Sequence, residues 1–153
     1  MRIAIAALVA TASMLSPLMA QAPAPTPPAA APAAPAAAAP AAGDPAAGER
    51  VFAQCRACHQ VGPTARNVVG PQLNGLFGRK AGSVAGFNYS PAFKTPAVAE
   101  KVWSPENFAV YIRNPREVTP GTRMVFAGIR SDTQIADLTA YLRQFDAEGK
   151  RAP

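Results

Sequence analysis

The stretch Cys55-Arg56-Ala57-Cys58-His59 sets two cysteines three positions apart and places a histidine directly after the second. On a helical turn, residues three apart share a face, so both sulfurs can reach one edge of a flat ligand. The imidazole of the next residue then lies beneath that ligand. The spacing C-x-x-C-H is typical of c-type haem attachment, in which the thiols add to two vinyl groups and the histidine binds the iron. The pentapeptide therefore predicts a haem site.

Three other interpretations of the two cysteines stay open on the motif alone. A C-x-x-C pair can be a thiol–disulfide redox couple. It can be half of a zinc site, but the whole chain holds only two cysteines and one histidine, which leaves zinc short of its usual ligands. Short motifs also match by chance.

An iron bound by His59 has a second axial position, and the sequence offers one candidate for it. Of the four methionines, Met1, Met14 and Met19 lie in an N-terminal apolar segment, so Met124 is the only one in the folded part. A lone methionine usually fills a gap in a core. Met124, however, follows a Pro-Gly loop, where backbone turns place the side chain. His/Met ligation fills both axial positions and raises the haem potential, which suits electron transfer.

With both candidate ligands placed, the chain resembles a class I cytochrome c of the mitochondrial and purple-bacterial periplasmic type. The matching blocks run in family order through nearly the whole folded part, from about Gly48 to the C-terminal helix. They are 55–59, 69–80, 86–90, Trp103, Tyr111 with Asn114-Pro115, 120–129 and 137–142. The resemblance implies an all-α fold, the small cytochrome c fold of several short helices and long loops wrapped around one covalent haem. That haem c would be attached through Cys55 and Cys58.

The resemblance also implies roles for single residues around the haem. His59 and Met124 become the axial ligands of the iron, and the carbonyl of Pro71 accepts the hydrogen bond that fixes the imidazole ring. Buried propionates must be hydrogen-bonded or paired. The residues that match this role are Arg79, Tyr89 and Trp103, and those that match hydrogen-bonding positions beside the methionine are Tyr111 and Thr122. Ordinary core packing is the alternative role for Trp103 and Tyr111.

The sequence departs from the mitochondrial pattern at a few positions. Phe93 stands where that pattern has an asparagine in a buried polar network, Val118 replaces an aromatic residue, and the stretch 95–102 is a few residues longer. Gln54 and Glu117 stand where mitochondrial relatives carry lysine. These departures concern the tuning of the reduction potential and the positive charge around the exposed haem edge. They do not affect the expected ligands of the iron.

The N-terminus is typical of an export signal. Residues 1–20 hold one basic residue, an apolar core and small residues, and Ala20-Gln21-Ala22 offers a cleavage site. An uncleaved membrane anchor is the alternative, although residues 3–20 are only just long enough to span a bilayer. Residues 21–43 contain seven prolines, thirteen alanines and no charge, so we expect a disordered, extended linker. Export fits the resemblance, because thioether attachment in this family occurs outside the cytoplasm.

Residues 44–153 form the expected cytochrome c domain, and charge indicates the kind of partner it has. The formal net charge of the chain is +6, and neither a nucleic-acid motif nor a run of clustered basic residues occurs. We therefore expect a monomer that binds acidic docking faces of redox proteins and no nucleic acid. Phe126 would pack near the exposed haem edge, and the candidate docking cations are Arg56, Arg66, Arg116, Arg123 and Arg130.

Local signals predict several helices and no strand. A helix should begin with Asp44 as its cap and Pro45, and carry Gly48, Phe52 and Cys55 toward the attachment site. The resemblance implies that this helix crosses the C-terminal helix closely at Gly48. The segment 60–89 is rich in Gly, Asn and Pro and should be loop. Shorter helices should start at Ser90-Pro91 and at Ser104-Pro105, the second one stopping before 114–115. A capping box at 131–134 should open the last helix.

These observations predict a periplasmic electron carrier that moves one electron through an exposed haem edge. Its partners would be membrane or periplasmic redox proteins, such as an oxidase, a quinol–cytochrome c reductase, a reaction centre or a dehydrogenase. One alternative is the same carrier tethered to the periplasmic face of the inner membrane. Another is an enzyme, either a dithiol oxidoreductase or a haem peroxidase. No βαβ pattern supports the former, and no second histidine exists to serve the latter.

Overall fold

The computed structural model describes residues 42–152. The export signal expected at 1–20 and nearly all of the linker expected at 21–43 lie outside these residues. The elements in chain order are α1 (Pro45–Phe52), the 3-10 helix η1 (Pro91–Lys94), α2 (Pro96–Ala99), α3 (Pro105–Arg113), α4 (Pro115–Val118) and α5 (Asp132–Arg143). Within 42–152 there are two isolated β-bridges and no strand, so the all-α fold is confirmed.

Capping residues start the helices where the sequence predicts. The side chain of Asp44 accepts a hydrogen bond from the amide of Ala46 at the start of α1. Ser104 and Asn107 form a complete, reciprocal capping box at the start of α3. At the start of α5, the side chain of Ser131 accepts from the amide of Gln134. That bond is one half of the box predicted there.

Two details of the predicted helices are wrong. Helix α1 ends at Phe52, so it does not carry Cys55. The cysteine lies instead in a separate turn, in which the amide of His59 donates to the carbonyl of Cys55 over 2.9 Å. The short helices α2 and α4 were not predicted. Helix α4 begins directly where α3 stops, because the side chain of Asn114 caps it by accepting from the amide of Glu117.

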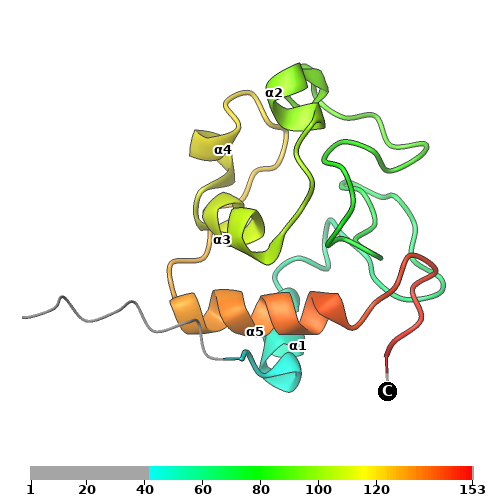
Figure 1. Cartoon of the computed structure of the whole chain (residues 1–153), viewed down its shortest axis with the longest axis vertical. Helices are drawn as coiled ribbons and strands as arrows, with labels where there is room; N and C mark the ends of the chain where they lie inside the picture. Colours follow the sequence, from blue (N-terminus) through cyan, green and yellow to red (C-terminus); the bar gives the residue numbers. More distant parts are fainter. Residues whose placement is uncertain (1–41, 153) are drawn as a thin grey trace, which may run out of the picture. The chain divides into compact units, whose positions relative to one another are not determined.

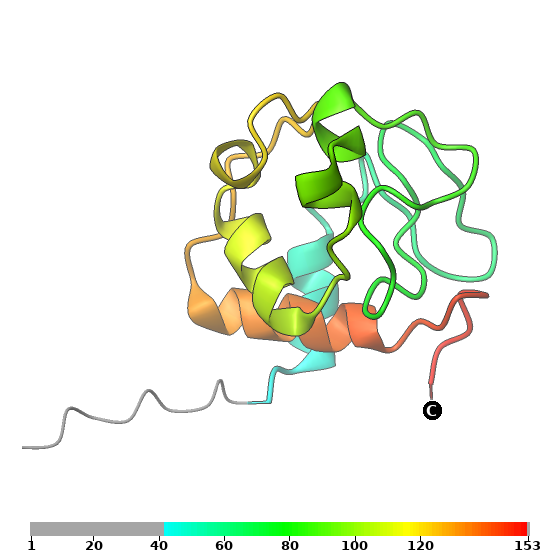
Figure 2. The ribbon, with the colours of Figure 1, turned by 45° about the horizontal axis from the view of Figure 1, so that its top comes forward.

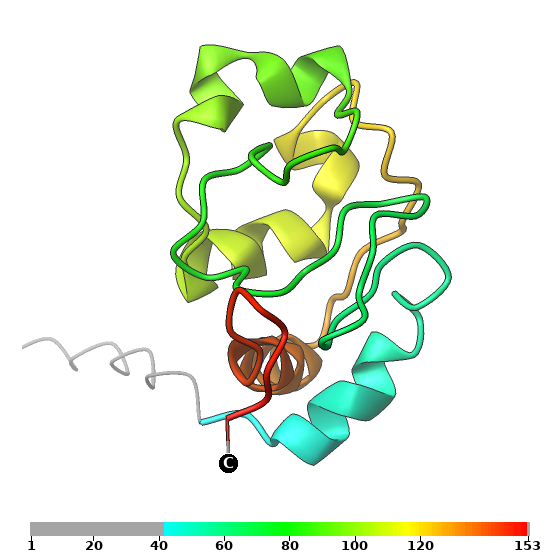
Figure 3. The same ribbon diagram turned by 90° about the vertical axis from the view of Figure 1, so that its right-hand side faces the viewer.

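Helices α1 and α5 cross at close range, as Figures 1 and 3 show. A Cβ at Gly48 would collide with the carbonyl oxygen of Asp137, so only glycine permits this approach. The prediction that Gly48 lets the two helices meet is confirmed. The buried core between the helices is apolar and consists of Phe52, Leu76, Phe108, Ile112, Ile129, Ile135, Leu138, Tyr141, Leu142 and Phe145.

The long loop 53–89 lies on one flank of the fold, and α3 and α4 lie on the other (Figure 2). The loop is tied to the helical side by backbone pairing. The amide of Gly78 donates to the carbonyl of Trp103 over 2.8 Å, and Lys80 forms a β-bridge with Val102. Within residues 42–152, no helix is both long and apolar enough to cross a membrane.

Candidate functional site

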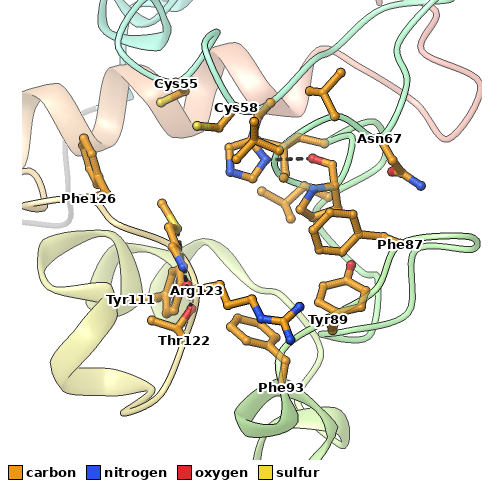
Figure 4. A pocket seen from close by; sticks show the side chains of 18 of the residues that line it. Cys55, Cys58, Asn67, Phe87, Tyr89, Phe93, Tyr111, Thr122, Arg123 and Phe126 are labelled. Atoms are coloured by element: carbon orange, nitrogen blue, oxygen red, sulfur yellow. Dashed lines mark hydrogen bonds between the residues drawn. The ribbon is translucent and has the colours of Figure 1, made fainter.

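A cavity of about 590 Å³ opens between the loop flank and the helical flank. This volume lies in the range of about 300–1,000 Å³ that is typical of ligand and cofactor sites. Apolar side chains from the loops, α3 and α5, among them Leu76, Phe108 and Leu142, form its inner wall. All ten predicted site residues line it: Cys55, Cys58, His59, Pro71, Arg79, Tyr89, Trp103, Tyr111, Thr122 and Met124. Figure 4 shows this cavity.

The two cysteines lie at one edge of the cavity, next to the histidine that follows them (Figure 4). Burial, together with the nearby thiol of Cys58, raises the pKa of the Cys55 thiol to about 11. A reactive dithiol needs the opposite, a lowered pKa that makes the thiolate available at neutral pH. Burial of Cys55 therefore disfavours the thiol–disulfide enzyme.

The imidazole of His59 is held by the loop that faces it. Its Nδ1 lies 2.7 Å from the carbonyl oxygen of Pro71. Because a carbonyl only accepts, Nδ1 must carry the proton, which leaves the lone pair of Nε2 free to bind a metal. Burial lowers the pKa of His59, and the bond to Pro71 opposes this shift. The contact expected between these two residues is confirmed.

Gly70 lies directly against the same imidazole. A Cβ at this position would lie 2.7 Å from Nδ1 and 2.8 Å from Nε2 of His59. The backbone of Gly70 is in turn fixed by its amide, which donates to the carbonyl of Cys58 over 2.8 Å. Gly70 lies in the matching block 69–80, and the sequence predicted no separate role for it. Its lack of a side chain is what makes room for the ring.

Hydrogen bonds connect Met124 with Thr122 and Tyr111. The amide of Met124 donates to Oγ1 of Thr122 over 3.2 Å. Burial raises the pKa of the Tyr111 phenol, and a hydrogen bond with the hydroxyl of Thr122 opposes this shift. The Tyr111 hydroxyl lies 3.4 Å from the sulfur of Met124 and donates to it. Both residues expected beside Met124 are therefore found there, and they hold the sulfur on the cavity wall.

At the far side of the cavity, near Tyr89, the guanidinium of Arg79 has no ion pair and the hydroxyl of Ser90 has no hydrogen bond within the described residues. Arg79 donates to the carbonyls of Asn74 (2.6 Å) and Gln72 (3.2 Å), and none of the ion pairs among residues 42–152 involves it. Burial lowers the pKa of its guanidinium. Ser90 is buried, and its Oγ has no hydrogen-bond partner within the described part. A buried hydroxyl without a partner costs free energy.

Tyr89 and Trp103 complete this side of the cavity. Tyr89 is buried, and its hydroxyl accepts from the amide of Val84 over 3.3 Å. Trp103 packs edge-to-face on Tyr111, with ring centroids 5.1 Å apart, and its amide donates to the carbonyl of Arg79. These contacts place both residues at the cavity wall, and their contact with propionates stays a prediction.

The residues present fit a haem. The largely apolar cavity is lined by two thiols, a neutral imidazole with a free Nε2 and a thioether. At its far side, the unpaired guanidinium of Arg79 and the unpartnered hydroxyl of Ser90 match the carboxylates of propionates. The sequence did not single out Ser90 as a site residue, because a serine that precedes a turn gives the same local signal. Among residues 42–152, no three His, Cys, Asp or Glu residues lie together as a metal site.

The five candidate docking arginines are all exposed, and two of them have partners. Arg56 forms an ion pair with Glu49, with 3.2 Å between Nη2 and Oε1. Arg123 donates to the carbonyl of Asn88 over 3.4 Å and so links the methionine loop to the loop across the cavity (Figure 4). Phe126 is partly buried and lines the cavity, next to the highly exposed Val125.

The chain is similar in sequence and in structure to known proteins. The model of the Cytochrome c family matches residues 45–146. The chain is 49% identical to cytochrome c2 of Blastochloris viridis over 103 residues, which are 67% of this chain and 79% of that protein. It is 52% identical to a cytochrome c2 of Rhodoplanes tepidamans over 100 residues, which are 65% and 91% of the two chains. The solved structure of cytochrome c2 from Rhodospirillum centenum superposes with a TM-score of 0.61 and 41% identity, and covers 68% of this chain and 99% of that chain.

Proposed function

The chain belongs to the cytochrome c family, and on this premise we propose that it is a periplasmic electron carrier with His/Met-ligated haem. It carries one covalent haem c on Cys55 and Cys58, and it is an electron carrier rather than an enzyme. The haem iron supplies the one-electron couple. The protein supplies the two axial ligands, the dry cavity and the surface that meets the partner.

The observation that carries the ligation is the pair of hydrogen bonds within one cavity. The carbonyl of Pro71 accepts a hydrogen bond from the protonated Nδ1 of His59, so Nε2 keeps a free lone pair. Tyr111 donates to the sulfur of Met124, so the thioether is held in the same cavity. A thioether stabilises the reduced iron relative to the oxidised iron, so this pair of ligands favours a high potential. With both axial positions filled, no site remains for a substrate.

The apolar wall adds to this effect. Leu76, Phe108 and Leu142 are buried and offer no hydrogen bond to a charge at the centre of the cavity. An excess positive charge on the oxidised iron is less stable in such surroundings than in water. Arg79 and Ser90 would hold the propionates at the far side, where a cation compensates their charge. The same cavity thus retains the haem and tunes its potential.

The partner would approach at the side where the cysteines and Phe126 line the cavity. Arg66, Arg116 and Arg130 are exposed and form no ion pair within the described residues. Free cations of this kind steer an acidic partner and raise the association rate. Acidic redox proteins of the membrane or periplasm are the partners that such a surface fits. The tethered form of the same carrier is the second candidate, and the N-terminal sequence is the feature that favours it.

Ligation by Met124 is tested in the holoprotein with Met124→Ala. The oxidised variant should lose the weak far-red band that arises from the bond between sulfur and iron, and its reduction potential should fall. Val125→Ala is the matched control, because the side chain of Val125 is 89% exposed and lies next in the chain. This control should keep both the band and the potential. A Met124→Ala protein with an unchanged spectrum would show that another group binds the iron.

A further inference from the structure

Phe93 lies at the centre of a row of aromatic rings on one wall of the cavity. Its ring stacks on that of Tyr89 with a centroid separation of 5.7 Å and an interplanar angle of 27°. It meets Tyr111 edge-to-face at 6.1 Å and 86°. Trp103 covers another part of the Tyr111 ring at 5.1 Å. The phenol that donates to Met124 therefore contacts two aromatic rings, and Figure 4 shows one of them, Phe93, beside Tyr111.

The backbone fixes the position of Phe93. Its amide donates to the carbonyl of Ser90 over 3.0 Å, within the single turn of η1. On the other side, Gly82 has a φ of 74°, and a Cβ there would lie 3.0 Å from the carbonyl oxygen of Phe93. The ring is thus held in place against both tyrosines.

The chemistry of the enclosed hydroxyl explains why an apolar ring matters here. The Tyr111 hydroxyl has one proton to donate, and it points to the sulfur of Met124 over 3.4 Å. A thioether is a weak acceptor, and a water molecule or a polar side chain would compete for that proton. Phe93 has no acceptor to offer, and its ring lies against the phenol, which is only 7% exposed. Thr122 occupies the other polar contact of the hydroxyl.

We propose that Phe93 is a positioning residue for the axial methionine, because it keeps water from the Tyr111 hydroxyl and so reserves that proton for the sulfur of Met124. This inference rests on the proposed ligation by Met124. It predicts that Phe93 acts through the hydroxyl of Tyr111, and not by packing alone. The distinction can be measured, because the contribution of a hydrogen bond disappears when its donor is removed.

The experiment is a double-mutant cycle in the oxidised holoprotein. Imidazole from solution competes with Met124 for the iron, so its affinity reports how firmly the methionine is held. Phe93→Asn should raise the imidazole affinity about fivefold, which corresponds to the loss of one typical hydrogen bond. In a Tyr111→Phe background, Phe93→Asn should add almost nothing. Phe93→Leu should stay close to wild type, because leucine also excludes water.

Phe87→Asn is the positional control. Phe87 packs on Tyr89 with a centroid separation of 4.8 Å, but it is not paired with Tyr111. This variant should leave the imidazole affinity and the far-red band unchanged. Equal effects of Phe93→Asn and Phe93→Leu, or an undiminished effect of Phe93→Asn in the Tyr111→Phe background, would overturn the proposal.

A measurement on the unmodified protein keeps the inference testable if Phe93→Asn fails to fold. In the reduced holoprotein, the hydroxyl proton of Tyr111 should give an NMR signal in slow exchange with water and a cross-peak to the ring of Phe93. A hydroxyl that exchanges rapidly would overturn the proposal. If the wild-type protein shows no far-red band, the proposed ligation itself fails. If the band is present and the cycle shows no coupling, only the role of Phe93 fails.

Discussion

The backbone amide of Asp44 lies 2.8 Å from a carboxylate oxygen of Asp137, although the two residues are 93 positions apart. The bond fixes the start of α1 against the middle of α5. Asp137 is 9% exposed, so the carboxylate is largely removed from water and this amide is a needed partner. The same stretch of α5 also faces Gly48, where the two helices meet at closest range.

Asp137→Ala should therefore lower the free energy of unfolding. The expected loss is about 1–3 kcal/mol, the usual range for a hydrogen bond to a charged group. Chemical unfolding of the holoprotein measures this loss. Asp132→Ala is the matched control on the same helix, because Asp132 is 82% exposed and its ion pair with Arg113 lies at the surface. That pair should contribute no more than about 1 kcal/mol. Equal losses in the two variants would contradict the role of Asp137.

Gly70→Ala should disturb the proximal ligand without removing it. The added methyl group would lie less than 3 Å from both ring nitrogens of His59, so the imidazole must move. Overpacking of this kind costs about 1–3 kcal/mol. We expect the reduction potential to fall. The hydrogen bond from Nδ1 to the carbonyl of Pro71 should also weaken, which should shift the NMR signal of the Nδ1 proton in the reduced protein.

Pro71→Ala is the control for that variant. It keeps the backbone carbonyl that accepts from His59 and adds nothing on the face where Gly70 lies. Its Nδ1 proton signal should stay close to the wild-type position. If Gly70→Ala leaves both the potential and this signal unchanged, the backbone near Gly70 is free to yield and the glycine is not needed for the imidazole.

Much of this structure could be predicted from local signals, and what was missed depends on distant contacts. Asp44-Pro45 and Ser104-Pro105 mark their helices correctly, because a cap and a proline act within one turn. The end of α1 at Phe52 was missed, since the chain turns there to bring Cys55 to the cavity. No local preference encodes such a turn.

The site shows the same division. The C-x-x-C-H spacing of residues 55–59 predicted the attachment site. The resemblance supplied Pro71 and Tyr111, both of which contact the expected partners. Ser90 could not be found in this way, because its importance comes from the lack of a partner for a buried hydroxyl. Only the packed structure shows which polar atoms are left without one.

Reversing the charge of a candidate docking arginine tests the cationic docking surface. Arg116→Glu should lower the second-order rate of electron transfer to an acidic partner at low salt, and should weaken the dependence of that rate on ionic strength. Electrostatic steering raises association rates by about 10- to 1,000-fold and is screened over about 10 Å at 0.1 M salt. Arg123→Glu should weaken this dependence as well, because the hydrogen bond of Arg123 to the neutral carbonyl of Asn88 leaves the positive charge of its guanidinium in place.

Lys150→Glu serves as the control for the charge itself. It changes the net charge by the same amount, but Lys150 lies in the C-terminal segment, on the opposite side of the fold from helix α4, which carries Arg116 (Figure 1). The rate of electron transfer by the Lys150→Glu variant should depend on ionic strength in the same way as the wild-type rate. A wild-type rate that is flat across salt for acidic partners would argue against a cationic docking face.

The N-terminus decides between the free and the tethered carrier. The weak apolar character of residues 3–20 and the site Ala20-Gln21-Ala22 favour cleavage, while the 23 residues of the Pro/Ala-rich stretch suit a tether. In extended form, that stretch would reach about 60–70 Å and keep the haem domain near membrane partners. Such a tether would raise the effective concentration of the carrier at the membrane.

Fractionation of the native host distinguishes the two. We expect haem-stained protein in the osmotic-shock fluid, with a mature N-terminus near Gln21 or Pro23. A variant with both Ala20→Leu and Ala22→Leu removes the small residues that cleavage needs, so it should stay with the membrane and keep the residues before Gln21. If the wild-type protein is recovered only from detergent-extracted membranes, with Met1 or Arg2 still present, the carrier is anchored.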